Sequence, residues 1–163
     1  LAVNHIANKN QPNALGSVGH IEVSPNSRNV IAGNSLFTVD IRSPDINKLV
    51  KMENELKQMT TDICKKYKIE FEMDQIGGFD PVAFDKECLN NIRNSANKFG
   101  YSHKDIVSGA GHDACWINTV APSAMIMCPC VDGLSHNEAE EIKPEWASSS
   151  TNVMLHAAIA SAT

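Results

Sequence analysis

The feature that most constrains the fold is an abrupt change of hydrophobic period at Ser43-Pro44-Asp45. Before it, residues 35–42 alternate, with three apolar side chains on one face, which is the pattern of a strand with one buried side. After it, apolar residues recur at helical spacing as far as residue 66. A proline near the start and an aspartate at the positive end of the helix dipole favour a helix that begins here. The sequence therefore predicts a strand followed directly by a long amphipathic helix, in a chain of the α/β class.

Three further segments complete a first unit. Residues 1–11 have the pattern of the last turns of a helix, and residues 17–24 and 68–76 alternate like strands. The resulting order, a helix tail followed by β-β-α-β, is similar to a ferredoxin-like split β-α-β unit that lacks its first strand. We therefore expect an incomplete ferredoxin-like unit over residues 1–76.

A second unit is expected over residues 77–163, because Gly77-Gly78 and Asp80-Pro81 mark a boundary. Its apolar patterns predict helices and strands in alternation, at residues 84–99, 105–107, 114–118, 124–128 and from Pro144 onward. The continuous apolar run at 124–128 is typical of a strand that is buried on both faces. This half is therefore predicted to be a piece of an α/β sheet.

Charge and cysteine content exclude several classes of protein. The net charge of −5 and the pI near 5.6 argue against nucleic acid and anionic membranes as partners, because both select basic patches. The N-terminus has no signal-peptide pattern and resembles the last turns of a helix, so we expect the chain to begin inside a larger protein. The five cysteines are odd in number and form no CxxC pair, which indicates free thiols in a reducing cytoplasm.

Residues 108–114, SGAGHDA, form the first candidate site. Gly109 and Gly111 flank an alanine directly before His112, so the backbone can approach a ligand closely and donate its N–H groups. An imidazole at this place could hydrogen-bond a carbonyl oxygen on which negative charge develops. The alternative is a structural histidine at a helix N-terminus, with Asp113 as its cap.

Residues 133–141, GLSHNEAEE, form the second candidate site. The loop follows a predicted buried strand, and α/β sheets bind ligands at the carboxyl ends of their strands. A metal-bound histidine needs an acceptor for its other ring nitrogen, and Glu138 or Glu140 could supply one for His136. The alternative is a solvated loop histidine before the acidic first turn of the last helix.

Asn29 and Arg42 are the candidate binding residues of the first unit. Arg42 ends the strand at 35–42 on the face opposite its apolar stripe, where a guanidinium could bind a carboxylate through two hydrogen bonds. The alternative is a surface arginine that pairs with Asp40 or Asp45.

Three motifs stand in the same order as in a known family. They are VGHIEVSPNSRNVIAGNSLFTVDIRSPD at residues 18–45, SGAGHDA at 108–114 and GLSHNEAEEI at 133–142. Together they resemble the C-terminal part of the N-carbamoyl-L-amino acid hydrolases. That family includes β-ureidopropionases and allantoate amidohydrolases, and it is related to dinuclear-metal aminoacylases and zinc carboxypeptidases. The resemblance covers essentially the whole chain, although full members are much longer.

The resemblance implies a role for each half of the chain. Residues 1–76 correspond to most of a lid domain that also forms the dimer interface. Residues 77–163 correspond to the closing segment of a metallopeptidase-like α/β catalytic domain.

It also implies the roles of individual residues. His136 matches the last metal ligand of the family. Gly111 and His112 match the residues that hold the carbamoyl or amide group and its tetrahedral intermediate. Asn29 and Arg42 match lid residues that bind the substrate, with Arg42 on its carboxylate.

The activity implied is hydrolysis of the C–N bond of N-carbamoyl-L-amino acids or related ureido acids, such as β-ureidopropionate and allantoate. The expected cofactors are two divalent ions (zinc, manganese or cobalt), and the expected partners are a small substrate and a second copy bound through the lid. The family's other metal ligands and its catalytic glutamate would lie upstream of Leu1, so this chain alone is expected to be inactive, with an incomplete metal site or none. The alternatives are an aminoacylase or dipeptidase of the same superfamily, and a non-catalytic dimerisation or binding module.

Overall fold

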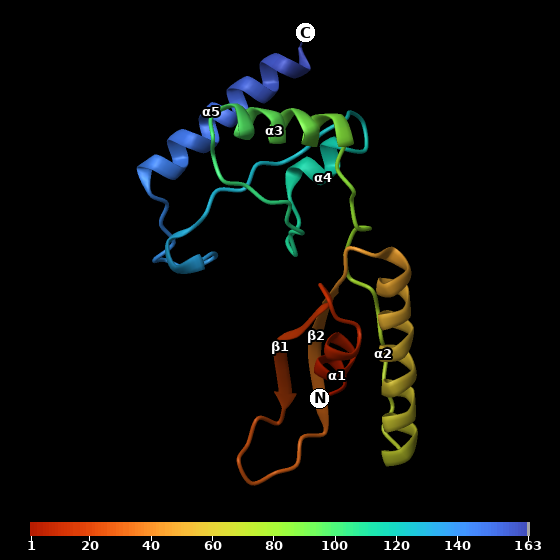
Figure 1. Ribbon diagram of the computed structural model, residues 1–163. Helices are drawn as coiled ribbons and strands as arrows, with labels where there is room; N and C mark the ends of the chain where they lie inside the picture. Colours follow the sequence, from red (N-terminus) through yellow and green to blue (C-terminus); the bar gives the residue numbers. More distant parts are fainter. Residues whose placement is uncertain (163) are drawn as a thin grey trace. The chain divides into compact units, whose positions relative to one another are not determined.

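The computed structural model describes residues 1–162. In chain order the elements are α1 (Ala2–Lys9), β1 (Leu15–Ser24), β2 (Asn34–Arg42), α2 (Ile46–Tyr67), α3 (Lys86–Lys98), α4 (Asp113–Ile117), a 3-10 turn (Val131–Gly133) and α5 (Pro144–Ser161) (Figure 1). All the helices predicted from the hydrophobic periods are present.

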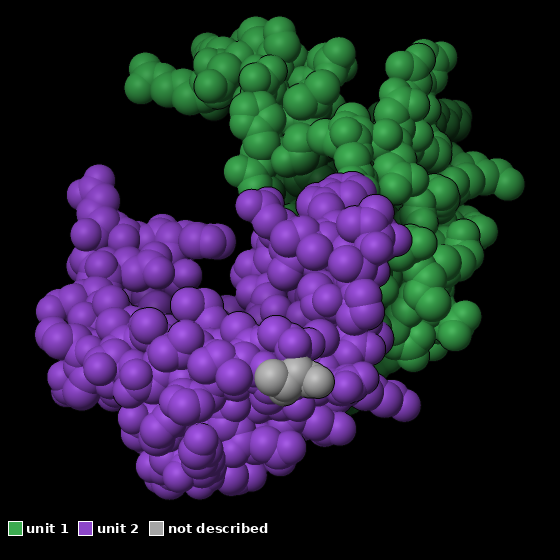
Figure 2. All heavy atoms as spheres, turned by 90° about the horizontal axis from the view of Figure 1, so that it is seen from above, with its two compact units in different colours: residues 1–81, 107–109 green, residues 82–106, 110–163 purple. Residues whose placement is uncertain are grey.

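The chain forms two compact units, which are coloured separately in Figure 2. Unit 1 comprises Leu1–Pro81 together with Val107–Gly109. Unit 2 comprises Val82–Ile106 and the chain from Ala110 onward. The segment Val107–Gly109 thus leaves unit 2, joins unit 1 and returns. Whether the halves act as lid and catalytic segment stays a prediction.

β1 and β2 form a two-stranded antiparallel sheet in unit 1. Leu15 pairs with Arg42 at one end of the hairpin, and Ser24 pairs with Asn34 at the other. The register shifts between Val18 and His20, as at a β-bulge. Both strands are predicted by the alternation of their residues, and the structure confirms them.

The core of unit 1 lies where α1 and α2 meet the hairpin. Ile6 of α1 and Met52 of α2 are both 0% exposed, and Ala14 completes the buried cluster. Ile41 of β2 packs against them. Since Ile41 points into the core, its neighbours on β2 point away from it, and this places Arg42 on the other face of the strand.

α2 begins where the change of hydrophobic period predicts. The Asp45 carboxylate accepts hydrogen bonds from the backbone N–H groups of Asn47 and Lys48, at 2.9 and 3.3 Å, and so satisfies two donors that have no partner inside the helix. The helix ends at Tyr67, and Lys68 adopts a left-handed conformation with φ of 56°.

The prediction of a third strand in unit 1, at residues 68–76, is wrong. Residues 69–76 belong to no helix or strand and have no β-ladder partner within residues 1–162. Ile69, Phe71 and Met73 are 58%, 43% and 41% exposed. Alternation tells which side chains share a face, whereas a strand also needs a neighbour for its N–H and C=O groups. The α/β class is confirmed, with a sheet reduced to two strands.

Unit 2 is built on α3 and α5, which pack against each other. The Asp85 carboxylate caps α3 by accepting the Cys88 backbone N–H at 2.9 Å. The Phe99 ring contacts the His156 ring of α5 edge-on, with centroids 4.8 Å apart. Buried small and β-branched side chains line the helix pair, namely Ala96, Val153 and Ala157.

The strands predicted at 105–107 and 124–128 are also wrong. Within residues 1–162 neither segment is part of a helix or a strand, because the one sheet consists of β1 and β2 and a strand needs a ladder partner. The run at 124–128 is not buried on both faces either, because Met127 is 46% exposed.

The structure has free thiols at all five cysteines, of which Cys115 is buried. Within residues 1–162, no helix combines the length and the apolar character that crossing a bilayer requires.

Candidate functional site

The loop that carries His136 is closed by backbone hydrogen bonds. After the 3-10 turn, the chain returns so that the Val131 N–H donates to the Glu141 carbonyl at 2.8 Å. His136 has a left-handed backbone, with φ of 56°, which is uncommon for a residue with a side chain. Such a conformation persists only where the surroundings hold it.

Glu140 supplies the contacts that hold this conformation. Its Oε2 accepts the His136 backbone N–H at 2.8 Å, and its Oε1 accepts the Cys130 thiol at 3.8 Å. The Glu140 N–H donates in turn to the Asn137 carbonyl at 3.0 Å. The sequence offered Glu138 or Glu140 as an acceptor for the ring of a metal-bound His136, whereas the Glu140 carboxylate binds the backbone amide of that residue.

Replacing Glu140 with alanine is expected to accelerate hydrogen–deuterium exchange of the His136 amide by about threefold to tenfold, because a charge-assisted hydrogen bond is lost. Glu140→Gln keeps one acceptor oxygen and should have a smaller effect. Exchange measured by mass spectrometry on peptides spanning residues 130–141 tests this. Glu138→Ala is the control, since Glu138 makes no hydrogen bond or ion pair with residues 1–162. Equal exchange in both alanine variants would contradict the assignment.

His112 is the residue that begins α4. Its backbone is extended, with φ of −138° and ψ of 151°, and its carbonyl accepts the Cys115 N–H at 2.9 Å. Asp113 lies inside the first turn, so the alternative in which Asp113 caps the helix is wrong. The His112 side chain is half-buried, and Gly111 before it is exposed.

Arg42 stands at the end of β2 and is held by two partners. Its Nε and Nη2 donate to the two oxygens of Asp40 at 2.9 and 2.5 Å, and its Nη1 donates to the Gly109 carbonyl at 2.7 Å. The hydrogen bond from Arg42 lowers the pKa of the Asp40 carboxyl below its ordinary value. The contribution of this pair to stability is therefore present above the unfolded pKa and is lost as the pH falls through the lowered folded pKa.

The alternative proposed for Arg42 is thus partly correct. Arg42 pairs with Asp40, as that alternative has it, whereas Asp45 is used as the cap of α2. The contact with Gly109 was not predicted, and it connects the end of β2 to the second residue of SGAGHDA.

Asn29 lies far from Arg42 along the hairpin. Asn29 belongs to the loop between Ser24 and Asn34, where its side chain accepts the Ser27 hydroxyl at 2.8 Å. Figure 1 shows this orange loop continuing beyond the ends of the strands. The nine residues of β2 span roughly 30 Å. One small substrate therefore cannot contact both side chains of the same chain.

The predicted site residues are divided between the units. Asn29 and Arg42 belong to unit 1, and Gly111, His112 and His136 belong to unit 2. The sequence named Asp40 as an alternative partner of Arg42 and Glu140 as a possible partner of the His136 ring. It missed the Gly109 carbonyl as a partner of Arg42 and the His136 backbone amide as the group that Glu140 binds.

The described residues do not by themselves fit a metal centre. Within residues 1–162, no group of three His, Cys, Asp or Glu side chains is arranged to hold an ion. A catalytic zinc site needs three protein ligands and an open position for water. His136 can thus supply at most one ligand of such a centre.

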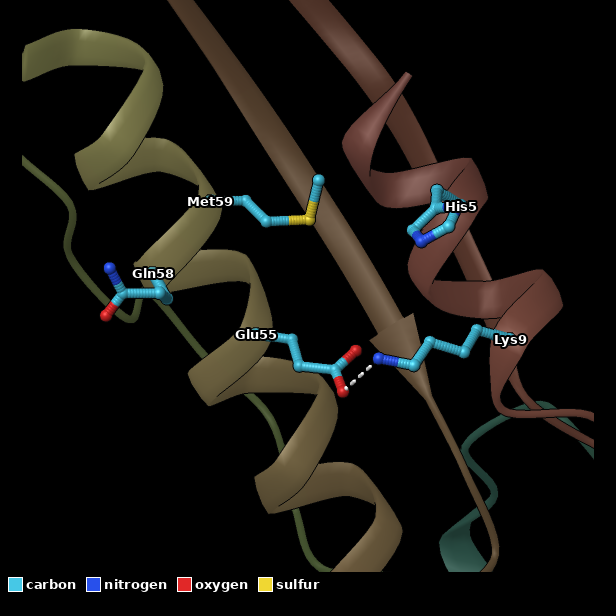
Figure 3. A pocket seen from close by; sticks show the side chains of 5 residues that line it. All are labelled: His5, Lys9, Glu55, Gln58 and Met59. Carbon is cyan, nitrogen blue, oxygen red and sulfur yellow. Dashed lines mark hydrogen bonds and ion pairs between the residues drawn. The ribbon is translucent and has the colours of Figure 1, made fainter. Parts of the chain in front are cut away.

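A hollow between α1 and α2 contains none of the predicted site residues. Figure 3 shows its lining, which consists of His5, Lys9, Glu55, Gln58 and Met59. Lys9 Nζ donates to Glu55 Oε1 at 2.9 Å across it and lowers the pKa of that carboxyl. The charged groups of the hollow therefore neutralise each other.

Known proteins resemble this chain over three quarters or more of its length. It is 51% identical over 160 residues to the N-carbamoyl-L-amino-acid amidohydrolase of Rhizobium meliloti, with 98% of this chain and 38% of that protein covered. It is 32% identical over 122 residues to the allantoate amidohydrolase of Escherichia coli K12, with 75% of this chain and 30% of that protein covered.

A solved structure shows the same fold. The amidase of the hydantoinase/carbamoylase family from Burkholderia multivorans superposes with a TM-score of 0.89 at 48% identity, and the match covers 95% of this chain and 38% of that one. The chain thus spans less than two fifths of the length of these relatives. The resemblance inferred from the three motifs is confirmed by these proteins. Residues 4–160 match peptidase family M20/M25/M40, and the chain belongs to that family.

Proposed function

We propose that this chain is the C-terminal part of a longer hydrolase, called the parent enzyme below. The parent enzyme would cleave the C–N bond of N-carbamoyl-L-amino acids or related ureido acids. The observation that carries this proposal is the 51% identity over 160 residues to an N-carbamoyl-L-amino-acid amidohydrolase. The 32% identity to an allantoate amidohydrolase supports the wider class of ureido substrates.

The residues of unit 2 are proposed to act on the scissile group. Gly111 has no side chain, so the backbone there can approach the carbamoyl group. The His112 imidazole hydrogen-bonds the carbonyl oxygen as negative charge develops on it. His136 supplies one metal ligand, and the further ligands of two divalent ions come from outside residues 1–162. Unit 2 is thus proposed as part of the catalytic domain.

The residues of unit 1 are proposed to bind the substrate and a second copy. Arg42 binds the substrate carboxylate. Asn29 lies too far from Arg42 to reach the same molecule, and this supports a homodimer in which Asn29 comes from the other copy. The role of unit 1 is then that of a lid that also forms the dimer interface.

Side-by-side assays of the parent enzyme test the reaction. We expect kcat/KM for N-carbamoyl-L-amino acids to exceed that for the matching N-acetyl-L-amino acids by at least about tenfold, because a site that hydrogen-bonds an N–H group rejects an analogue that lacks it. A preference for the acetyl compounds would instead indicate an aminoacylase. A parent protein that cleaves neither and contains no metal would indicate a non-catalytic module.

A further inference from the structure

Arg42 is held more firmly than an ordinary surface arginine. Two of its nitrogens bind the two oxygens of Asp40, which is a bidentate pair, and a third binds the Gly109 carbonyl. Asp40 and Arg42 are two residues apart on β2, so both side chains leave the strand on the face opposite Ile41. The guanidinium is therefore fixed by groups of unit 1 on two of its sides.

This arrangement leaves part of the guanidinium available. A guanidinium has five N–H donors, and Arg42 uses three of them within residues 1–162. One N–H group on Nη1 and one on Nη2 therefore remain as donors for a carboxylate. Arg42 can accordingly bind a carboxylate without releasing Asp40 or Gly109.

A fixed guanidinium binds a carboxylate more tightly than a mobile one. A free arginine side chain has many rotamers, and ordering it on binding weakens affinity. Where Asp40 has already ordered Arg42 in the folded protein, this loss does not occur when substrate binds. The Asp40 charge acts in the opposite direction, because it lies beside the same guanidinium and like charges repel.

We infer that Asp40 is a positioning residue for Arg42. It holds the Arg42 guanidinium in place before the carboxylate of the substrate binds. This inference rests on the proposed function, in which Arg42 binds that carboxylate. The carbonyl of Gly109 is the second anchor, and it connects the carboxylate-binding group to the segment that precedes Gly111 and His112.

The test compares two substrates of the parent enzyme, the best cleaved N-carbamoyl-L-amino acid of a panel and its C-terminal carboxamide. The acid preference is the ratio of their kcat/KM values. Asp40→Ala is expected to lower this preference by about threefold to tenfold, the range that corresponds to ordering one long side chain. The change should appear as a higher KM for the acid, with kcat and the kinetics of the carboxamide unchanged. Asp40→Asn keeps one acceptor oxygen and should have a smaller effect.

Asp105→Ala is the matched control. Asp105 lies outside all three motifs and accepts the same kind of bidentate hydrogen bonds from Arg93, at 3.0 and 2.6 Å. A general loss of stability would affect both variants alike, whereas positioning of Arg42 affects the acid preference only in Asp40→Ala.

The outcomes separate this inference from the proposed function. If Arg42→Ala abolishes the acid preference and Asp40→Ala leaves it unchanged or raises it, the positioning role is wrong and the assignment of Arg42 stands. If Arg42→Ala itself leaves the preference intact, the carboxylate-binding role of Arg42 is wrong, and the inference about Asp40 with it.

Discussion

Replacing His136 with alanine is expected to lower kcat/KM of the parent enzyme by at least about 100-fold and to reduce its metal content. Loss of a group that merely supports a metal ligand already weakens metal binding by about 10–100-fold, so loss of a ligand itself should have at least that effect. Metal analysis of the purified variant, beside steady-state kinetics, measures both quantities.

His103→Ala is the control for this experiment. His103 is an exposed histidine of unit 2 outside the motifs, and its ring nitrogen Nδ1 contacts the Tyr101 carbonyl at 3.1 Å. The control variant should keep its metal and its activity. An unchanged metal content in the His136 variant would show that His136 is a solvated loop histidine.

The second large effect is expected in the core of unit 1. Met52→Ala should lower the free energy of unfolding by about 2–5 kcal/mol, the usual range for truncating a fully buried Met, Leu or Ile. Met52 is 0% exposed and packs against Ile6 and Ala14. Truncating its side chain would therefore leave a cavity that solvent does not reach. Urea unfolding followed by circular dichroism gives the change.

Met154→Ala is the matched substitution on the surface. Met154 lies on α5 and is 58% exposed, and its truncation should change the free energy of unfolding by less than about 0.5 kcal/mol. Similar losses in the two variants would mean that the cluster around Met52 is not the core.

The helices and the hairpin of this fold can be predicted from the sequence because their signals are local. The spacing of apolar residues, Asp45 as a cap and Pro144 at a helix start all act within one or two turns of chain. The three wrong strands have a common cause. Residues 68–76, 105–107 and 124–128 have strand-like patterns, but a ladder depends on a neighbour that no local pattern specifies.

The candidate site divides in the same way. His112, His136 and Arg42 can be singled out because glycines, glutamates or an alternating strand surround them. Asp40 and Glu140 were named as possible partners, but two contacts were missed, since Glu140 binds a backbone amide and Gly109 acts through its carbonyl. Backbone groups are the same in every residue, so contacts to them leave no trace in the residue types.

The length of the β1–β2 hairpin would have a genetic consequence in the proposed dimer. If each site combines Arg42 of one chain with Asn29 of another, two defective alleles can compensate for each other. A copy damaged at Asn29 and a copy damaged at Arg42 would each form poor sites alone. In a mixed dimer, one site would combine the intact Arg42 of the copy damaged at Asn29 with the intact Asn29 of the copy damaged at Arg42. That site would have both residues, and the other site would have neither. Under the proposed dimer, allelic complementation would thus follow from the length of the hairpin.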